Sequence, residues 1–186
     1  MKKPFDIIVS FFVLLILSPI LLVLILLVRL SSKGPAIHWS NRVGQDNTIF
    51  KMPKFRSMYI DTPDLATHLL KDSQSHITPL GSFMRKTSLD ELPQLWSIFT
   101  GKMSFVGPRP ALHNQYDLIE LRTKKGIDKY KPGLTGWAQI NGRDEIPIPQ
   151  KVDLDEYYCI HSNFLFDIKI IIKTFANVIF KKDIAH

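Results

Sequence analysis

The clearest feature in the pattern of hydrophobic and polar positions is one uninterrupted apolar run near the N-terminus. Ile7 to Val28 is 22 residues long and contains no charged residue. As a single helix it would be ~33 Å long, enough to cross a hydrocarbon core of ~30 Å. A buried helix of a soluble protein normally keeps a polar stripe, which this run lacks, and no small-residue cleavage site of a signal peptide follows it. The pattern therefore predicts insertion into a membrane.

Ser18 and Pro19 interrupt this run near its centre. Pro19 cannot donate a backbone hydrogen bond, so it predicts a kink, and Ser18 is a local candidate to bond a freed carbonyl. The flanks give no orientation for a span, because both are basic. A helix–break–helix that enters and leaves one face of the membrane explains both features. We expect this re-entrant form rather than a kinked single span. The basic flanking residues are Lys2, Lys3, Arg29 and Lys33.

Shorter apolar patterns predict helices and short strands in the remainder of the chain. Ala36 to Tyr59 indicates a hairpin or an extended segment, because short apolar runs flank Gly44 and Asn47. Lys131 to Gly142 is rich in glycine and broken by Pro132, so it is predicted as a loop or a short strand. Helical periodicity marks four segments, which are Leu89–Phe99, His113–Lys125, Val152–Ile160 and Asn163–Phe180.

These patterns together predict an α/β fold, helix-rich with short strands. Residues 1–35 are expected to form the re-entrant membrane helix and residues 36–186 a cytosolic domain. Asp61 to Pro79 is polar and predicts a loop with a helical turn or two. The last helix has an apolar face interrupted by lysines, so it could pack on the domain or lie on the membrane surface as an interfacial helix. The first helix of the domain is predicted to share one face among Leu92, Leu95, Trp96 and Phe99.

Charge narrows the kinds of partner that the chain could bind. The formal net charge is +7, of which residues 1–35 contribute 4 − 1 = +3 and the remainder 7 − 3 = +4. Such a surplus suits phosphate-bearing partners, whether nucleotides, lipid head groups or nucleic acid. The single cysteine, Cys159, excludes an internal disulfide framework, and the six histidines show no metal-ligand spacing. A zinc site is therefore not expected.

The first candidate for chemistry is the acidic pair Asp90 and Glu91. Ser88 and Glu91 have the spacing of a capping box, in which Asp90 would only favour the helix dipole. Adjacent carboxylates at the positive end of a helix also provide a low-pKa nucleophile and a metal-binding oxygen, both of which phosphoryl chemistry requires. The residues alone favour the capping box and leave the catalytic interpretation open.

Three basic or glycine-rich segments are further candidates. Arg109 lies between Pro108 and Pro110, so its guanidinium would be presented rigidly, as bidentate phosphate binding requires. Pro132 to Arg143 offers glycine amides, the stacking face of Trp137 and the charge of Arg143 as a platform for a nucleotide or phosphate. A surface turn would explain Arg109 equally well, and other cations are equally ambiguous, namely Lys54, Arg56, Arg85 and Lys86.

Taken together, the motifs resemble the bacterial sugar transferase family, the monotopic polyprenyl-phosphate phosphoglycosyl transferases in their minimal, catalytic-domain form. The resemblance is to an ordered series that covers nearly the whole chain, which makes it far more specific than any one motif. The series runs through Ser18-Pro19, Lys54–Met58, Ser88–Gln94, Met103–Pro110, Pro132–Arg143, Asp155-x-x-Tyr158 and Phe166–Lys169.

The resemblance implies transfer of a phospho-sugar from a UDP-sugar to undecaprenyl phosphate at the cytoplasmic face of a bacterial inner membrane. It implies Mg²⁺ as cofactor and ping-pong catalysis through a covalent phospho-sugar enzyme. Asp90 would be the nucleophile and a metal ligand, and Glu91 would assist as a base or through the metal. Membrane lipid is a further expected partner, nucleic acid is not, and a homodimer stays open. The implied substrate-binding residues are Lys54, Arg56, Arg85, Arg109, Trp137, Gln139, Asn141 and Arg143.

Two other functions are compatible with the same residues. A non-catalytic membrane-anchored module would use the arginines to dock anionic lipid, with Ser88–Glu91 serving only as a helix cap. A metal-dependent nucleotide-sugar hydrolase would release its product without any lipid acceptor. Replacement of Asp90 by Asn separates these functions, because Asn can also cap a helix but cannot act as a nucleophile.

Overall fold

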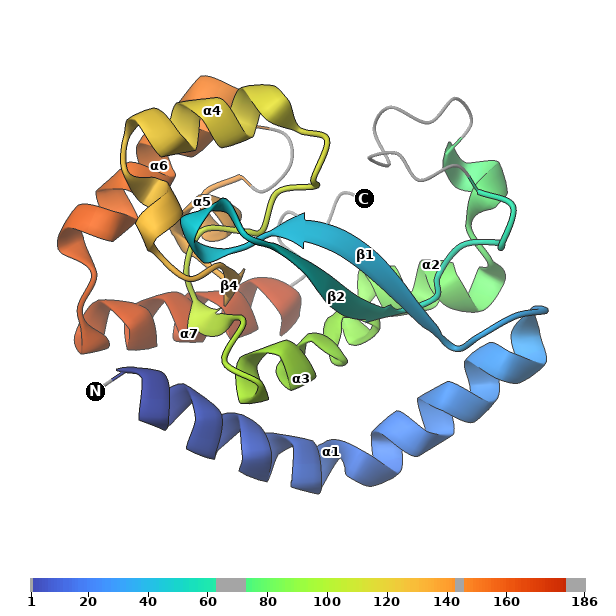
Figure 1. Cartoon of the computed structure of the whole chain (residues 1–186). Helices are drawn as coiled ribbons and strands as arrows, with labels where there is room; N and C mark the ends of the chain where they lie inside the picture. Colours follow the sequence, from blue (N-terminus) through green and yellow to red (C-terminus); the bar gives the residue numbers. More distant parts are fainter. Residues whose placement is uncertain (1, 63–72, 143–145, 180–186) are drawn as a thin grey trace.

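The computed structural model describes residues 2–62, 73–142 and 146–179, and it is helix-rich with two pairs of short strands (Figure 1). This is the α/β class that the sequence predicts. The α-helices are α1 (Lys2–Ser31), α2 (Pro79–Lys86), α3 (Gln94–Phe99), α4 (Tyr116–Lys124), α5 (Trp137–Ile140), α6 (Ile148–His161) and α7 (Phe164–Ile179). The strands are β1 (Ile37–Val43), β2 (Ile49–Phe55), β3 (Ser104–Val106) and β4 (Gly133–Thr135). Short 3₁₀ turns are η1 (Gln45–Asn47), η3 (Ser73–His76), η4 (Leu89–Glu91) and η5 (Ile127–Lys129).

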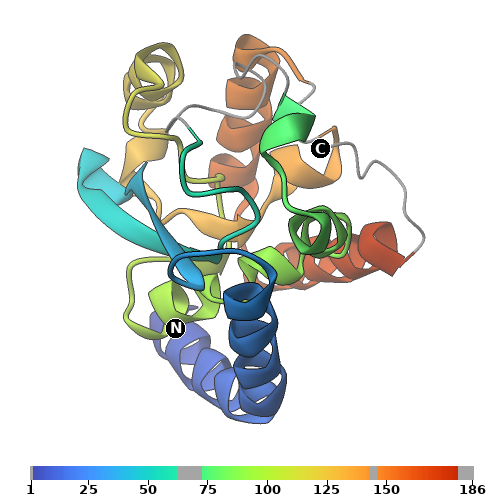
Figure 2. The same ribbon diagram turned by 90° about the vertical axis from the view of Figure 1, so that its right-hand side faces the viewer.

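The apolar run forms α1, one continuous helix with Pro19 inside it. The helix is bent, and both of its ends rise from the bend towards the rest of the chain (Figure 1, Figure 2). Ser18 Oγ donates a hydrogen bond of 2.7 Å to the carbonyl of Leu15, which Pro19 cannot serve. The predicted helix is therefore confirmed, and the predicted kink is a bend within one helix rather than a break between two.

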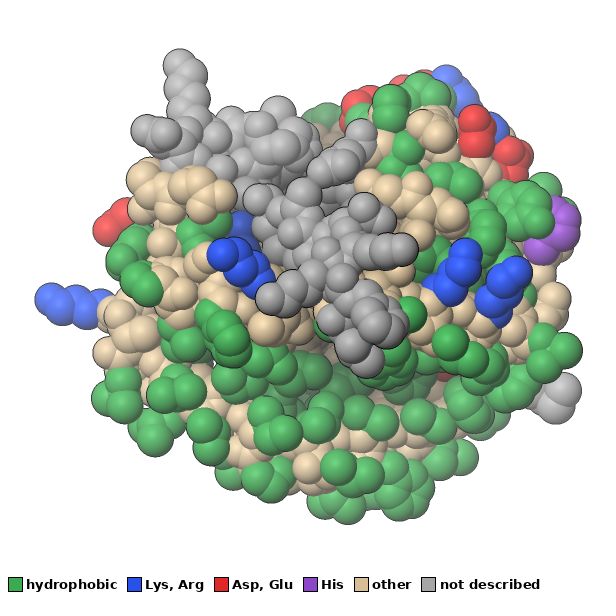
Figure 3. Space-filling view, turned by 180° about the vertical axis from the view of Figure 1, so that it is seen from behind, with side chains coloured by type: hydrophobic (Ala, Val, Ile, Leu, Met, Phe, Trp, Pro, Cys, Tyr) green, Lys and Arg blue, Asp and Glu red, His purple; other side chains and the backbone are tan. Residues whose placement is uncertain are grey.

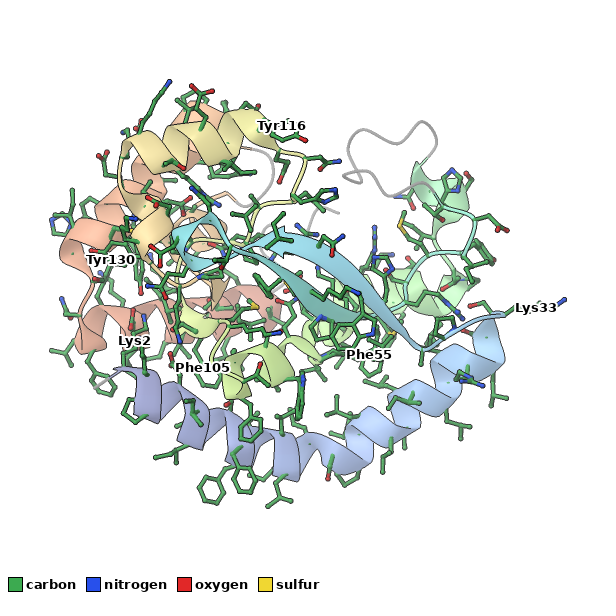
Figure 4. The ribbon with its side chains drawn as sticks, viewed as in Figure 1. Lys2, Lys33, Phe55, Phe105, Tyr116 and Tyr130 are labelled. Atoms are coloured by element: carbon green, nitrogen blue, oxygen red, sulfur yellow. The ribbon has the colours of Figure 1, made fainter. Side chains whose placement is uncertain are left out.

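Both ends of α1 are tied to the same body. At the N-terminal end, Lys2 Nζ forms a salt bridge of 2.8 Å with Asp167 and a hydrogen bond of 2.7 Å with the hydroxyl of Tyr158. Beyond the C-terminal end, Arg56 Nη2 donates to the carbonyl of Ser32 at 2.6 Å. Figure 4 shows Lys2 and Lys33 at opposite ends of the arch that α1 forms. The two ends of the apolar helix therefore meet the rest of the chain on one side.

The convex side of α1 is apolar and exposed. Within the described ranges, α1 is the one helix long and apolar enough to cross a membrane, judged by length and composition, and few of its side chains are buried. Seen from behind, hydrophobic side chains gather along the lower edge of the molecule, while most of the basic and acidic side chains in view lie higher (Figure 3). This distribution is the reverse of the one expected for a core helix and supports membrane association.

The predicted hairpin is present as the antiparallel pair β1–β2, in which Ile37 pairs with Phe55 and Val43 with Ile49. Phe55 packs in a buried cluster with Leu24 and Val28 of α1, below the hairpin in Figure 4. The hairpin therefore rests on the membrane helix through its β2 strand.

The second strand pair joins segments that lie far apart in sequence. Strands β3 and β4 are parallel, with Ser104 opposite Gly133 and Val106 opposite Thr135. A Cβ added to Gly133 would lie 2.1 Å from the amide nitrogen of Gly107, so only glycine permits this approach. The short strand predicted within Lys131–Gly142 is confirmed as β4, but Trp137–Ile140 forms the helix α5, which the prediction of a loop or strand missed.

The helix predicted over Leu89–Phe99 is wrong in two respects. It is divided into η4 and α3, and its apolar face is different, because Leu95 is buried while Trp96 is 51% exposed. Residue Ile98, absent from the predicted face, is fully buried beside Leu95. The reason is that α3 lies between the hairpin and α1, so it has apolar neighbours on two sides instead of one.

The last helix, α7, packs on the domain and also exposes apolar side chains. Ile170 is fully buried in the core cluster that α7 shares with α6. Leu165, Ile172 and Phe175 point outwards and are largely exposed. The expectation of core packing is confirmed, and the outer face stays available for a membrane surface.

Candidate active site

The acidic pair lies on a short turn rather than at a capped helix start. Ser88 has a left-handed conformation (φ 56°, ψ 17°), and its side chain makes no cap hydrogen bond. The carboxylate of Glu91 is bonded to basic side chains instead of the backbone of Ser88. The capping box, which the residues alone favoured, does not form, and so it does not explain this pair of carboxylates.

Glu91 is held by two cations at one oxygen atom. Its Oε1 accepts a hydrogen bond of 2.9 Å from Lys54 Nζ and one of 2.8 Å from Arg109 Nη2. Burial would raise the pKa of Glu91, but the charges of Arg109 and Lys54 outweigh burial and hold it well below its ordinary range. Glu91 is therefore ionised at all physiological pH values.

Asp90 is next to Glu91 but has a different environment. The residue is buried, and within the described residues its carboxylate has no recorded hydrogen bond or salt bridge. Burial raises the pKa of Asp90 to about 6, and the nearby charge of Lys54 offsets this only in part. A carboxylate that is more basic than usual, and to which no donor among the described residues is bonded, is suited to attack an electrophile.

Three cations surround the two carboxylates and come from separate segments. Lys54 is on β2, Arg85 on α2, and Arg109 follows β3, while both acidic residues are on η4. Arg85 acts on Asp90 through its charge and donates to Ser57 Oγ at 3.0 Å. The site therefore carries an excess of one positive charge, which favours an anionic ligand such as a phosphate.

The donor set fits a magnesium ion that is bound mainly by substrate. No group of three or more metal-ligating side chains is found in the part of the chain that the structure describes. Magnesium commonly uses one or two carboxylates together with substrate phosphates and water. With Glu91 already engaged by Lys54 and Arg109, Asp90 is the carboxylate that could serve as the protein ligand.

Arg56 and Trp137 make contacts with parts of the protein other than the acidic pair. Arg56 bonds the C-terminal end of α1, as described above, and so secures the membrane helix. Trp137 stacks on Tyr157, with ring centroids 5.7 Å apart, and packs against Phe166 at 5.0 Å. Both side chains thus have structural neighbours that the sequence motifs did not indicate.

The glycine-rich segment uses some of its polar groups within the protein. The amide of Gly133 donates to the carbonyl of Pro108 at 2.9 Å, so it is already used within the protein. The side chain of Asn141 donates to the carbonyl of Trp137 at 2.7 Å, and both polar side-chain atoms of Gln139 are buried without a partner among the described residues. Arg143 lies outside the described residues.

Sequence reasoning overlooked Arg122 on α4. Its guanidinium forms a buried salt bridge with Asp155 on α6 and also donates to the carbonyl of Arg109 at 2.8 Å. One signal could have revealed it, because Arg122 stands four residues after the buried Leu118 and so lies on the apolar face of its helix. A charged residue in such a position requires a buried partner.

Comparison with known proteins agrees with the motifs along the chain. Residues 1–181 match the family described as bacterial sugar transferase. The chain is 43% identical over 183 residues to the UDP-glucose:undecaprenyl-phosphate glucose-1-phosphate transferase of Escherichia coli (strain K12), covering 94% of this chain and 39% of that protein. It is 36% identical over 204 residues to the undecaprenyl-phosphate galactose phosphotransferase of Salmonella typhimurium (strain LT2), covering 100% of this chain and 42% of that protein.

A shorter relative is covered almost completely. The sugar transferase EpsL of Bacillus subtilis (strain 168) is 39% identical over 186 residues, which cover 99% of this chain and 90% of EpsL. The chain thus spans about two fifths of the first two relatives but nearly all of the third.

Proposed function

Because the chain belongs to the bacterial sugar transferase family, we propose that it transfers a sugar 1-phosphate from a UDP-sugar to undecaprenyl phosphate. The observation that carries this proposal is the pair Asp90 and Glu91 within a cluster of three cations. Phosphoryl transfer depends mainly on positioning and on neutralising charge, and this cluster offers both.

Asp90 is the proposed nucleophile. One of its carboxylate oxygens forms a bond to the β-phosphorus of the UDP-sugar while the bond from that phosphorus to the bridging oxygen breaks, and UMP leaves with the electron pair. An oxygen of undecaprenyl phosphate then attacks the same phosphorus, and the Asp90 carboxylate leaves. The products are the diphosphate-linked sugar and the original enzyme. The pKa of about 6 supports this role, because Asp90 is then ionised at neutral pH and still more basic than an ordinary carboxylate.

Glu91 has a positioning role in this proposal. Its depressed pKa makes it a weak base, which argues against a role in accepting protons. It holds Lys54 and Arg109 through one oxygen and so fixes two cations beside Asp90. These cations and Arg85 would contact the phosphates of the donor. When bound, Mg²⁺ would be held by Asp90 and those phosphates and would neutralise charge on them.

The membrane helix is proposed to be re-entrant, at the cytoplasmic face of the bacterial inner membrane. Support comes from the contacts that bring both ends of α1 to the same body, through Lys2 at one end and Arg56 at the other. The exposed apolar faces of α1 and α7 would then lie in the bilayer and at its surface. The acceptor cannot leave the membrane, so this arrangement keeps the site near its phosphate.

Intact-protein mass measurement tests the covalent step. The full chain is mixed with each of a panel of UDP-sugars without acceptor, and a mass gain equal to one sugar phosphate is expected with the true donor. The Asp90→Asn variant should bind membranes as before but gain no mass. Later addition of undecaprenyl phosphate should remove the adduct from the native chain.

Three results would contradict the proposal. Normal turnover without any adduct would exclude the covalent step. Release of free sugar phosphate without acceptor would indicate a nucleotide-sugar hydrolase. Binding of anionic lipid without turnover of any donor would indicate a non-catalytic module.

Labelling of single cysteines tests the membrane topology. Lys3→Cys and Lys33→Cys each place a thiol at an exposed position at one end of α1, while the native Cys159 is buried. A membrane-impermeant maleimide should label both variants in inverted vesicles and neither in right-side-out vesicles. Labelling of the two variants from opposite sides would establish a span and exclude the re-entrant form.

A further inference from the structure

We propose that Arg122, held by Asp155, is a positioning residue for Arg109 and acts by holding the main-chain carbonyl of Arg109. This inference rests on the phosphate-binding role given to Arg109 in the proposed function. Neither Arg122 nor Asp155 is expected to touch a substrate, because their contacts are within the protein.

The segment from Gly107 to Leu112 carries Arg109 and lies outside the regular helices and strands. It is nevertheless fixed, because four consecutive carbonyl oxygens each accept a hydrogen bond from another part of the chain. The bonds are Gly133 N to Pro108 O (2.9 Å), Arg122 Nη1 to Arg109 O (2.8 Å), Arg42 Nη1 to Pro110 O (3.2 Å) and Val43 N to Ala111 O (2.9 Å).

The bond to the carbonyl of Arg109 comes from a side chain that is itself anchored. Arg122 Nε and Nη2 donate to one oxygen of Asp155, at 3.0 and 2.5 Å. The side chains are 10% and 1% exposed, so the pair lies in the interior between α4 and α6. Three nitrogens of one guanidinium thus connect α6 to the backbone of Arg109.

Fold stability alone does not account for this pair. Apolar side chains of similar volume often stabilise a protein as well as a buried ion pair does, because desolvation offsets the attraction between the charges. Apolar side chains could not donate to the carbonyl of Arg109. A lysine could donate to Asp155 or to that carbonyl, but its single nitrogen lacks the planar fork that reaches both.

The consequence for Arg109 follows from its neighbours in sequence. Pro110 restricts Arg109 to extended conformations, and the bond from Arg122 selects one carbonyl orientation within that range. The guanidinium of Arg109 then meets Glu91 at 2.8 Å. Without the bond from Arg122, the peptide could rotate and displace the guanidinium from the acidic pair.

Binding of UDP to the full chain in lipid nanodiscs tests the inference. Arg122→Lys is expected to raise the Kd for UDP about ten- to a hundredfold, since displacement of a binding group by ~1 Å has effects of this size. The double variant Arg122→Met/Asp155→Leu removes both buried charges and should fold even if the single variant does not. It should weaken UDP binding by a similar factor. A Kd unchanged in either folded variant would overturn the inference.

A matched control and a coupling experiment separate positioning from a general structural role. Lys125 joins the same two helices at the surface, through Asp153 at 2.7 Å and Glu156 at 2.6 Å, and Lys125→Met should leave the Kd unchanged. In an Arg109→Met background, Arg122→Lys should cause no further loss of affinity. An independent, multiplicative loss in that background would show that Arg122 does not act through Arg109.

Amide hydrogen exchange without ligand distinguishes failure of this inference from failure of the proposed function. Arg122→Lys should increase exchange in Gly107–Leu112 at least about tenfold, with α4 and α6 unchanged. Unchanged exchange in that segment would overturn the inference, whatever the chain binds. Increased exchange in a native chain that binds no UDP would instead contradict the phosphate-binding role of Arg109.

Discussion

Two places in this chain bring a carboxylate and an arginine together, and they differ in how completely the charges are matched. At the α4–α6 interface, Asp155 and Arg122 form one enclosed pair, and a third nitrogen of Arg122 donates to a backbone carbonyl. Around η4, two carboxylates face three cations, and the side chains of Arg109 and Lys54 are 34% and 18% exposed. The matched pair is enclosed and every nitrogen of its guanidinium already bonds within the protein, whereas the unmatched cluster retains positive charge at the surface. This difference supports a structural role for the pair and the proposed binding role for the cluster.

The largest expected effect is that of Asp90→Asn, which should lower turnover at least about a thousandfold, as loss of a nucleophile does.

The Asp90→Asn variant should also be more stable than the native chain. Folding raises the pKa of Asp90 from 3.8 to about 6, so ionisation of Asp90 lowers the free energy of unfolding. This loss is complete above about pH 6 and absent below about pH 4. At pH 7 the free energy of unfolding of the variant should exceed that of the native chain by up to about 3 kcal/mol. Denaturant unfolding in detergent measures this difference. A less stable variant would show that Asp90 helps to hold the fold.

Asp155→Asn should have the opposite effect on stability. It leaves Arg122 buried without a counter-charge, which costs about 3 kcal/mol in the same unfolding measurement. Equal changes in the free energy of unfolding for Asp90→Asn and Asp155→Asn would contradict the distinction between a matched pair and an unmatched cluster.

The pH dependence of the rate sharpens the difference between the two acidic neighbours. In the native chain, kcat/KM should fall tenfold per unit below pH about 6, because protonated Asp90 cannot attack. In Glu91→Gln this fall in kcat/KM should begin at a lower pH, since the charge of Glu91 raises the pKa of Asp90. The variant should also lose about ten- to a hundredfold in kcat/KM as Lys54 and Arg109 lose their anchor. If kcat/KM of the variant falls below the same pH as in the native chain, a group other than Asp90 controls the pH dependence.

The smallest effect is predicted for the exposed ion pairs between α4 and α6. Lys125→Met removes two of them, but exposed pairs contribute little, so melting temperature and turnover should both stay unchanged. A marked loss of stability would mean that the surface contacts, and not Arg122 with Asp155, hold these helices together.

The strongest patterns predicted the fold well, and contacts between distant residues explain the rest. The apolar run gave α1, and Ser18 bonds a carbonyl beside Pro19 as expected, because both features are local. The pairing of β3 with β4 joins residues that no local pattern connects. The last two helices followed from helical periodicity, and the hairpin followed from the short apolar runs that flank Gly44 and Asn47.

The site was predictable in composition but not in geometry. Local spacing suggested a capping box at Ser88 and Glu91, and only the distant Lys54 and Arg109 explain why Glu91 turns away from the backbone. The link from Arg122 to the carbonyl of Arg109 was likewise hidden, because it depends on the tertiary position of α4.

The shared oxygen of Glu91 has a consequence for the rate of product departure. In the empty site this carboxylate competes with phosphate for the same two cations, Lys54 and Arg109. In the proposed reaction, an incoming phosphate would share these two cations with the carboxylate of Glu91, which already neutralises part of their charge. We expect this sharing to lower the affinity for UMP, the proposed first product, because UMP keeps only one phosphate with which to bind the two cations. In the proposed ping-pong order the site must be emptied before the second substrate enters, so weak retention of the first product would shorten each cycle.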